Sequence, residues 1–128
     1  MIRVLVADDH PMVRRGLRAT LAETTDIRVA EEAVDGLDML EKARSGGIDI
    51  ILLDLSMPGM SGFDALKQLM TELPKTRVII LSTYPEKQYA IRCLRAGAFG
   101  YLTKESAATE LVAAIRKVHQ GRKYASSS

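Results

Sequence analysis

Hydrophobic and polar positions along this 128-residue chain form two alternating patterns. Short, nearly continuous apolar runs predict strands covered on both faces, because a strand with one wet face alternates apolar and polar residues. These runs are residues 2–7, 27–30, 48–53, 78–81 and 98–102. Such strands are typical of a parallel sheet.

Segments with helical spacing separate the apolar runs. In the first, Val13, Leu17 and Leu21 recur every four residues and give a helix one hydrophobic side. Pro11 stands where this helix begins, and Gly97 follows the end of a later one. The alternation predicts an α/β fold class, a flavodoxin-like three-layer sandwich of five βα units with right-handed crossovers. We expect a parallel sheet in the order 2-1-3-4-5, which is common among such folds.

Composition places the chain among ordinary globular domains. Hydrophobic residues make up 47% of the sequence and charged residues 27%, enough for one packed core without disulfide or metal support. A net charge of +2 gives no argument for a nucleic acid partner. Cys93, the single cysteine, cannot form an intrachain disulfide, and no apolar run approaches the roughly 20 residues of a membrane span. The sequence therefore predicts a cytoplasmic protein without membrane contact.

Three acids follow two strands that the expected sheet order makes neighbours. Asp8 and Asp9 come directly after the first apolar run, and Asp54 directly after the third. Because the carboxyl ends of parallel strands share one edge, these carboxylates should converge. Carboxylates about 4 Å apart repel by roughly 4 kcal/mol per pair at an effective dielectric near 20, so the site must bind a cation or hold a proton, and a divalent cation is the simpler answer. Each acid alone is equally well explained as a helix cap, but the three together predict a Mg²⁺ site.

Other polar residues carry weaker signals. Lys104 and Ser82 follow the fifth and fourth runs at the same edge, where a solvated charge and a turn residue are the plainer interpretations. We interpret His10 as a helix cap or as a group that contacts a metal ligand. Arginines on the first helix predict a solvated surface, with a docking or dimer surface as the alternative. These arginines are Arg14, Arg15 and Arg18.

Four motifs in combination resemble the receiver domain of two-component response regulators, over about residues 2–121. The motifs are VLVADDH at residues 4–10, LDLSMPG at 53–59, LS at 81–82 and GAFGYLTK at 97–104. The resemblance implies that Asp54 accepts a phosphoryl group from a sensor histidine kinase. It also implies that Mg²⁺ binds Asp8, Asp9, Asp54 and the backbone carbonyl of Ser56.

The same resemblance implies how the modification acts. Lys104 and Ser82 are expected to contact the phosphoryl group, and Ser82 and Tyr101 to act as switch residues. The choice of Ser82 over the neighbouring Thr83 depends on the register of the fourth strand. The response is expected at the surface formed by the fourth helix, fifth strand and fifth helix. The residues expected to flank the pocket and tune the lifetime of the modified state are Ser56, Thr83 and Tyr84.

One departure indicates a subfamily. Many receivers have a proline directly after the lysine, whereas Glu105 follows Lys104 here. This resembles the NarL/FixJ-like regulators, which have a C-terminal helix-turn-helix output domain. We expect residues 1–121 to form the receiver domain and 122–128 to be a tail or the start of a linker, with the output domain not present. DNA would be bound only through that domain, and a homodimer on activation is a further expectation.

Rival functions fit the residues less well. Phosphatases with an aspartyl nucleophile typically have a D-x-D motif after the first strand, whereas Asp8 and Asp9 are adjacent in this sequence. A nucleotide- or flavin-binding domain is disfavoured because residues 7–12 contain no glycine-rich phosphate loop. The resemblance implies a phosphoacceptor regulator that catalyses only its own phosphoryl transfer and dephosphorylation, and no enzyme with a separate substrate. The alternative is a pseudo-receiver that binds partners without phosphorylation.

Overall fold

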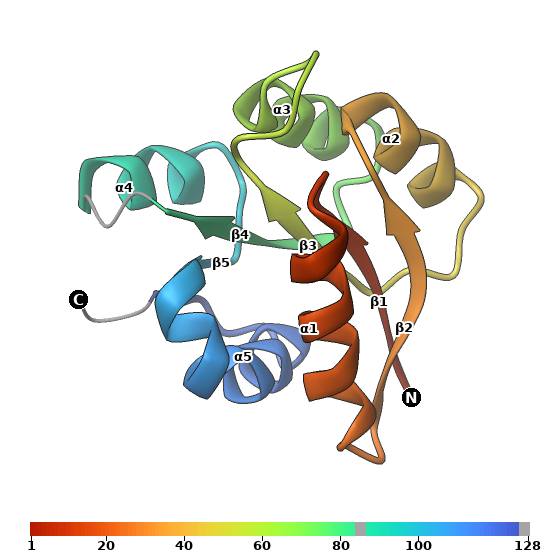
Figure 1. Cartoon of the computed structure of the whole chain (residues 1–128). Coiled ribbons are helices and arrows are strands. Elements are labelled where there is room, and N and C mark those ends of the chain that lie inside the picture. Colours follow the sequence, from red (N-terminus) through yellow and green to blue (C-terminus); the bar gives the residue numbers. More distant parts are fainter. Residues whose placement is uncertain (84–86, 126–128) are drawn as a thin grey trace.

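A computed structural model describes residues 1–83 and 87–125. Within these residues, six parallel strands form one sheet in the order β2-β1-β3-β4-β5-β6, with helices on both faces (Figure 1). The strands are β1 (Ile2–Ala7), β2 (Ile27–Ala33), β3 (Ile50–Asp54), β4 (Arg77–Ser82), β5 (Gly100–Thr103) and β6 (Tyr124–Ala125). The helices are α1 (Pro11–Ala22), α2 (Gly36–Arg44), α3 (Gly62–Glu72), α4 (Lys87–Arg95) and α5 (Lys104–His119). The predicted fold class and the order 2-1-3-4-5 are confirmed.

The central strands bury both faces, which explains their continuous apolar sequence. On β3, Ile51 and Leu53 belong to the core shared with α2, α3 and α4, while Ile50 and Leu52 face α1 and α5. All four side chains are inaccessible to solvent. Cys93 of α4 is also buried, and burial raises the pKa of its thiol. The sheet therefore separates two hydrophobic cores.

Helices begin immediately beside the carboxyl edge of the sheet. Thr103 ends β5, and its hydroxyl accepts a hydrogen bond from the backbone N–H of Ser106, so α5 begins at Lys104 without a connecting loop. On α3, a Cβ atom added to Gly62 would lie 2.6 Å from Cα of Leu55, the residue after β3. Glycine therefore lets α3 approach this edge closely.

Part of the segment expected as a tail or the start of a linker pairs with the sheet. Tyr124 and Ala125 pair with Gly100 and Tyr101 of β5 as the short parallel strand β6. The Tyr124 hydroxyl donates a hydrogen bond to Glu110 at 2.5 Å. Residues 126–128 lie outside the described residues. In the ranges that the structure covers, no helix has the length and apolar character needed to cross a bilayer.

Candidate functional site

The strand register brings Asp8 and Asp54 together at the carboxyl edge. Ala7 pairs with Leu53 between the neighbouring strands β1 and β3, so the next residue of each strand carries a carboxylate at the same level. Both carboxylate side chains are buried, with 1% exposure each. The convergence predicted from the strand order is confirmed.

Lys104 lies between these two buried acids. Its ammonium nitrogen is 3.3 Å from Oδ2 of Asp8 and 3.4 Å from Oδ2 of Asp54. The other oxygen of Asp54, Oδ1, accepts hydrogen bonds from the backbone N–H and the hydroxyl of Ser56, at 3.1 and 3.0 Å. The side chain of Asp54 is thus fixed through one oxygen while the other faces the lysine.

Asp9 and His10 complete the group on the loop after β1. Asp9 is more accessible than Asp8, with 29% side-chain exposure. The His10 ring nitrogen Nδ1 lies 2.9 Å from Oδ1 of Asp8 and 3.2 Å from Oδ1 of Asp9. The His10 ring therefore contacts both acids, and His10 also stands at the N-cap position of α1. Its role beside a metal ligand stays a prediction.

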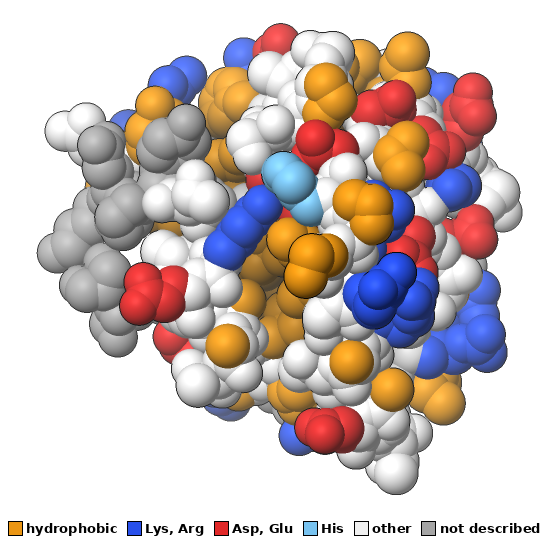
Figure 2. Space-filling model, in the orientation of Figure 1, with side chains coloured by type: hydrophobic (Ala, Val, Ile, Leu, Met, Phe, Trp, Pro, Cys, Tyr) orange, Lys and Arg blue, Asp and Glu red, His pale blue; other side chains and the backbone are white. Residues whose placement is uncertain are grey.

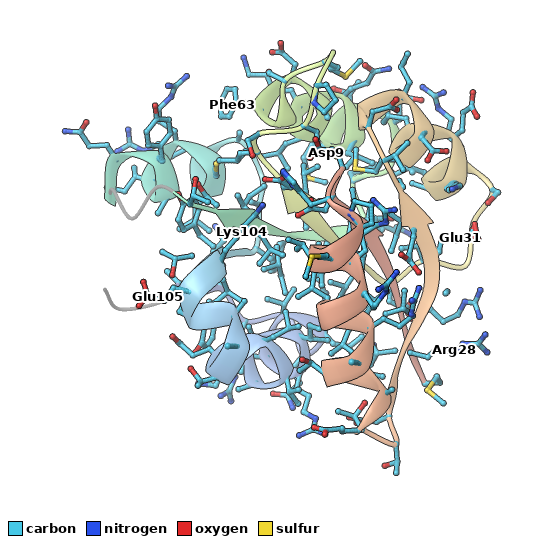
Figure 3. All side chains as sticks on the ribbon, in the orientation of Figure 1. Asp9, Arg28, Glu31, Phe63, Lys104 and Glu105 are labelled. Carbon is cyan, nitrogen blue, oxygen red and sulfur yellow. The ribbon has the colours of Figure 1, made fainter. Side chains whose placement is uncertain are left out.

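The labelled residues in Figure 3 show this arrangement from the side. Asp9, on the loop after β1, and Lys104, at the start of α5, lie on the same side of the sheet edge, while Glu105 lies away from the acids. In Figure 2, a histidine lies beside acidic and basic side chains above a hollow with hydrophobic walls. This hollow, of about 230 Å³, separates α1 from α5 and includes Met12, Leu17 and Lys104 in its lining. The hollow reaches the acidic group at Lys104.

The chemistry of the acidic group fits a hard divalent cation such as Mg²⁺. One ligand atom from each of Asp8, Asp9, His10 and Asp54 lies within 4.8 Å of the others. Among the described residues, Oδ2 of Asp8, Oδ1 of Asp9 and Oδ2 of Asp54 are buried and make no hydrogen bond. Three carboxylates against one ammonium leave an excess of negative charge, which a cation held by oxygen ligands and water would balance.

The remaining residues singled out by the sequence lie on β4, β5 and the loop after β4. Ser82 ends β4 and is buried, while Thr83 is exposed. Tyr101 lies on β5 with its side chain 3% exposed, opposite Ile80 of β4. Tyr84 falls outside the described residues. The roles assigned to these residues, and to the Ser56 carbonyl, stay predictions.

Comparison with known proteins identifies the family. The model of the response regulator receiver domain matches residues 4–116. This chain belongs to that family. The receiver domain is 43% identical over 120 residues, 94% of its length, to the uncharacterized transcriptional regulatory protein YxjL of Bacillus subtilis. It is 38% identical over 127 residues, 99% of its length, to the response regulator UvrY of Escherichia coli K12.

A solved structure agrees with these relatives. The signal receiver domain of NarL from Mycobacterium tuberculosis superposes with a TM-score of 0.88 at 36% identity, covering 94% of this chain and 98% of that one. The resemblance to the NarL/FixJ-like receivers is therefore confirmed. The chain spans 55% of YxjL and 58% of UvrY, so it corresponds to little more than half of each.

Sequence reasoning missed one residue next to the acids of the receiver domain. Arg14 was expected on a solvated face, but its side chain is only 16% exposed. Its guanidinium donates a hydrogen bond to the backbone carbonyl of Asp8 at 2.6 Å and another to Glu32 at 3.2 Å. The periodicity of the helix carried no signal for these contacts, because Asp8 precedes α1 and Glu32 lies 18 residues from Arg14.

Proposed function

We propose that this receiver domain is the phosphorylation-activated switch of a two-component system, with Asp54 as the residue that accepts a phosphoryl group from a sensor histidine kinase. The observation that carries the proposal is the state of the Asp54 carboxylate. Ser56 holds Oδ1, while Oδ2 lies beside Lys104 without a hydrogen bond among the described residues. One oxygen is therefore fixed and the other is available as a nucleophile.

The proposed transfer uses the residues around Asp54. Its Oδ2 attacks phosphorus and forms an acyl phosphate as the bond from phosphorus to the kinase histidine nitrogen breaks. Lys104, which is 3.4 Å from this oxygen, then pairs with an oxygen of the added group. The residues that would hold Mg²⁺ are Asp8, Asp9, Asp54 and the backbone carbonyl of Ser56. When bound, Mg²⁺ supplies positive charge that offsets the negative charge of the phosphoryl oxygens.

The hollow between α1 and α5 supports access by a kinase. Met12, at its margin, is 82% exposed, and the lining continues through Leu17 and Ala107 to Lys104. A helix that presents apolar side chains would bury this surface while its phosphohistidine reaches the acids. The face is visible in Figure 2, where hydrophobic side chains extend below the histidine.

The proposed response starts at Ser82. Phosphorylation increases the negative charge at Asp54 and adds acceptor oxygens, toward which the Ser82 hydroxyl turns to donate a hydrogen bond. Ser82 lies on β4 beside β5, whose Tyr101 is buried in this state. We expect the movement at Ser82 to change the packing of Tyr101 and hence the surface formed by α4, β5 and α5. In a regulator as long as its relatives, this surface would control a dimer or a DNA-binding output domain.

Intact-mass measurement after incubation with acetyl phosphate and Mg²⁺ tests the proposal. The wild type is expected to gain one phosphoryl group, and Asp54→Asn none. Asp64→Asn is the matched control, because Asp64 lies exposed on α3 and should leave the adduct unchanged. A wild type that gains no phosphoryl group would instead support the pseudo-receiver. Continuous phosphate release from unrelated esters would support an enzyme.

A further inference from the structure

The Arg14 guanidinium joins the loop of the acids to the edge strand of the sheet. It donates to the Asp8 carbonyl at 2.6 Å, and its Nε donates to Oε1 of Glu32 on β2 at 3.2 Å. Glu32 is itself held by two other cations. Arg18 pairs with its carboxylate, and Lys42 donates to its backbone carbonyl at 2.5 Å. Arg14 therefore binds Asp8 from a firmly anchored position.

The carbonyl that Arg14 binds belongs to the peptide plane between Asp8 and Asp9. The backbone N–H of Asp8 donates to Ala33 at 3.0 Å, and its carboxylate accepts from the N–H of His10 at 2.8 Å. Asp9 differs, because Oδ1 of Asp9 accepts no hydrogen bond from the described part of the chain. Since a peptide unit is planar, fixing this carbonyl fixes the backbone direction from which the Asp9 side chain leaves.

We propose that Arg14 is a positioning residue that aims the Asp9 carboxylate into the cation site. This inference rests on the proposed function, because it concerns the same Mg²⁺ site. Arg14 contacts a ligand residue only through the backbone, so it acts on the cation through geometry and through its charge. These two effects have opposite signs: a positive charge near the site repels Mg²⁺, whereas correct positioning of Asp9 strengthens its binding.

The test is a titration of the ¹⁵N-labelled chain with MgCl₂, followed by the amide NMR signals of His10 and Ser56. Arg14→Met is expected to weaken Mg²⁺ binding about 10-fold or more, the usual effect of losing a group that orients a metal ligand. Arg18→Met is the matched control. It removes the same charge from the same helix and the same partner, Glu32, but makes no contact with Asp8 among the hydrogen bonds of the described residues. Its affinity should equal or slightly exceed that of the wild type.

A second readout separates positioning from general loss of structure. With acetyl phosphate as donor, Arg14→Met should need a higher Mg²⁺ concentration for half-maximal phosphorylation of Asp54, yet reach the wild-type rate at saturation. Glu32→Gln weakens the anchor of Arg14 and should shift the Mg²⁺ dependence in the same direction. If the NMR spectrum of Arg14→Met is not that of a folded protein, Glu32→Gln takes its place in both measurements.

The outcomes distinguish this inference from the proposed function. Wild-type Mg²⁺ affinity in Arg14→Met, or in Glu32→Gln where only that variant folds, would overturn the positioning role. An equal loss in Arg18→Met would also overturn it, because charge or helix stability would then explain the effect. If the wild type binds Mg²⁺ but acquires no phosphoryl group, the proposed function fails. A weaker Mg²⁺ affinity in Arg14→Met alone would still support the positioning of Asp9.

Discussion

The two ends of the parallel sheet differ in whether their charged residues have hydrogen-bond partners. At the carboxyl end, Asp8, Asp9 and Asp54 lie close together, and each has a buried oxygen that no described residue hydrogen-bonds. Lys104 pairs with Asp8 and Asp54. At the amino end, Arg77 of β4 donates hydrogen bonds to the last carbonyls of α5 and lies over the Phe99 ring. Arg116 forms a two-pronged pair with Asp26 nearby, at 2.9 and 3.0 Å.

This difference shows where the fold gains stability and where it keeps a binding site. Charges that meet partners in good geometry stabilise the folded state, whereas buried charges of one sign oppose it. The same alternation of strands and helices produces both ends, since helices finish where strands begin. At the amino end, the last carbonyls of a helix therefore accept hydrogen bonds from cations such as Arg77. At the carboxyl end, polar residues of the loops surround carboxylate oxygens that lack a partner among the described residues.

The largest stability effect is expected at the amino end, from Arg77→Met. Nη1 of Arg77 lies 3.0 Å from the carbonyl of Val118 and 2.7 Å from that of His119. Losing a charged donor that serves two helix-end carbonyls should lower the free energy of unfolding by about 2 kcal/mol. Urea unfolding followed by circular dichroism would measure it.

Arg28→Met is the control for this measurement. Arg28 lies exposed on β2 and points away from the domain in Figure 3, and it has no ion pair with the described residues. Its replacement should change the free energy of unfolding by less than about 0.5 kcal/mol. Equal losses in the two variants would mean that the contacts of Arg77 contribute nothing specific.

At the carboxyl end, removing a charge is expected to raise the free energy of unfolding rather than lower it. Without divalent cations, Asp54→Asn should raise the free energy of unfolding by about 1 kcal/mol, because two repulsions are removed for one attraction to Lys104. Added Mg²⁺ should stabilise the wild type, so that it becomes more stable than Asp54→Asn. Asp64→Asn, in the first turn of α3, should instead be slightly destabilising, since an acid there favours the helix. A less stable Asp54→Asn in the absence of Mg²⁺ would contradict the view that the acids repel.

Local sequence patterns predicted the fold, but they did not predict contacts between segments that lie far apart in the sequence. The acids could be placed because strand order and the ends of two apolar runs suffice to bring Asp8 and Asp54 together. The strand β6 could not, since two residues carry no periodicity and their pairing depends on β5. Arg14 looked like a surface cation because its partner Glu32 lies 18 residues away, on a strand that continues past its last predicted residue.

The smallest expected effect concerns the exposed pair of Arg116 and Asp26. The hydrogen bonds from Arg116 hold the pKa of Asp26 below its ordinary value of 3.8. A carboxyl group with a lowered folded-state pKa adds stability above pH 3.8, and that contribution disappears as the pH falls through the lowered value. Arg116→Met should therefore be slightly less stable than the wild type at neutral pH and equally stable in strong acid.

Carbon-detected NMR titration of the side-chain carboxyls would measure the same change directly. The pKa of Asp26 should return toward 3.8 in Arg116→Met. Glu72 is an internal control, because Arg44 and then Gln68 hold its pKa at about 2 through a separate pair between α2 and α3. Its value should be the same in both proteins. A pKa of Asp26 that is the same in Arg116→Met and the wild type would show that Arg116 does not lower it.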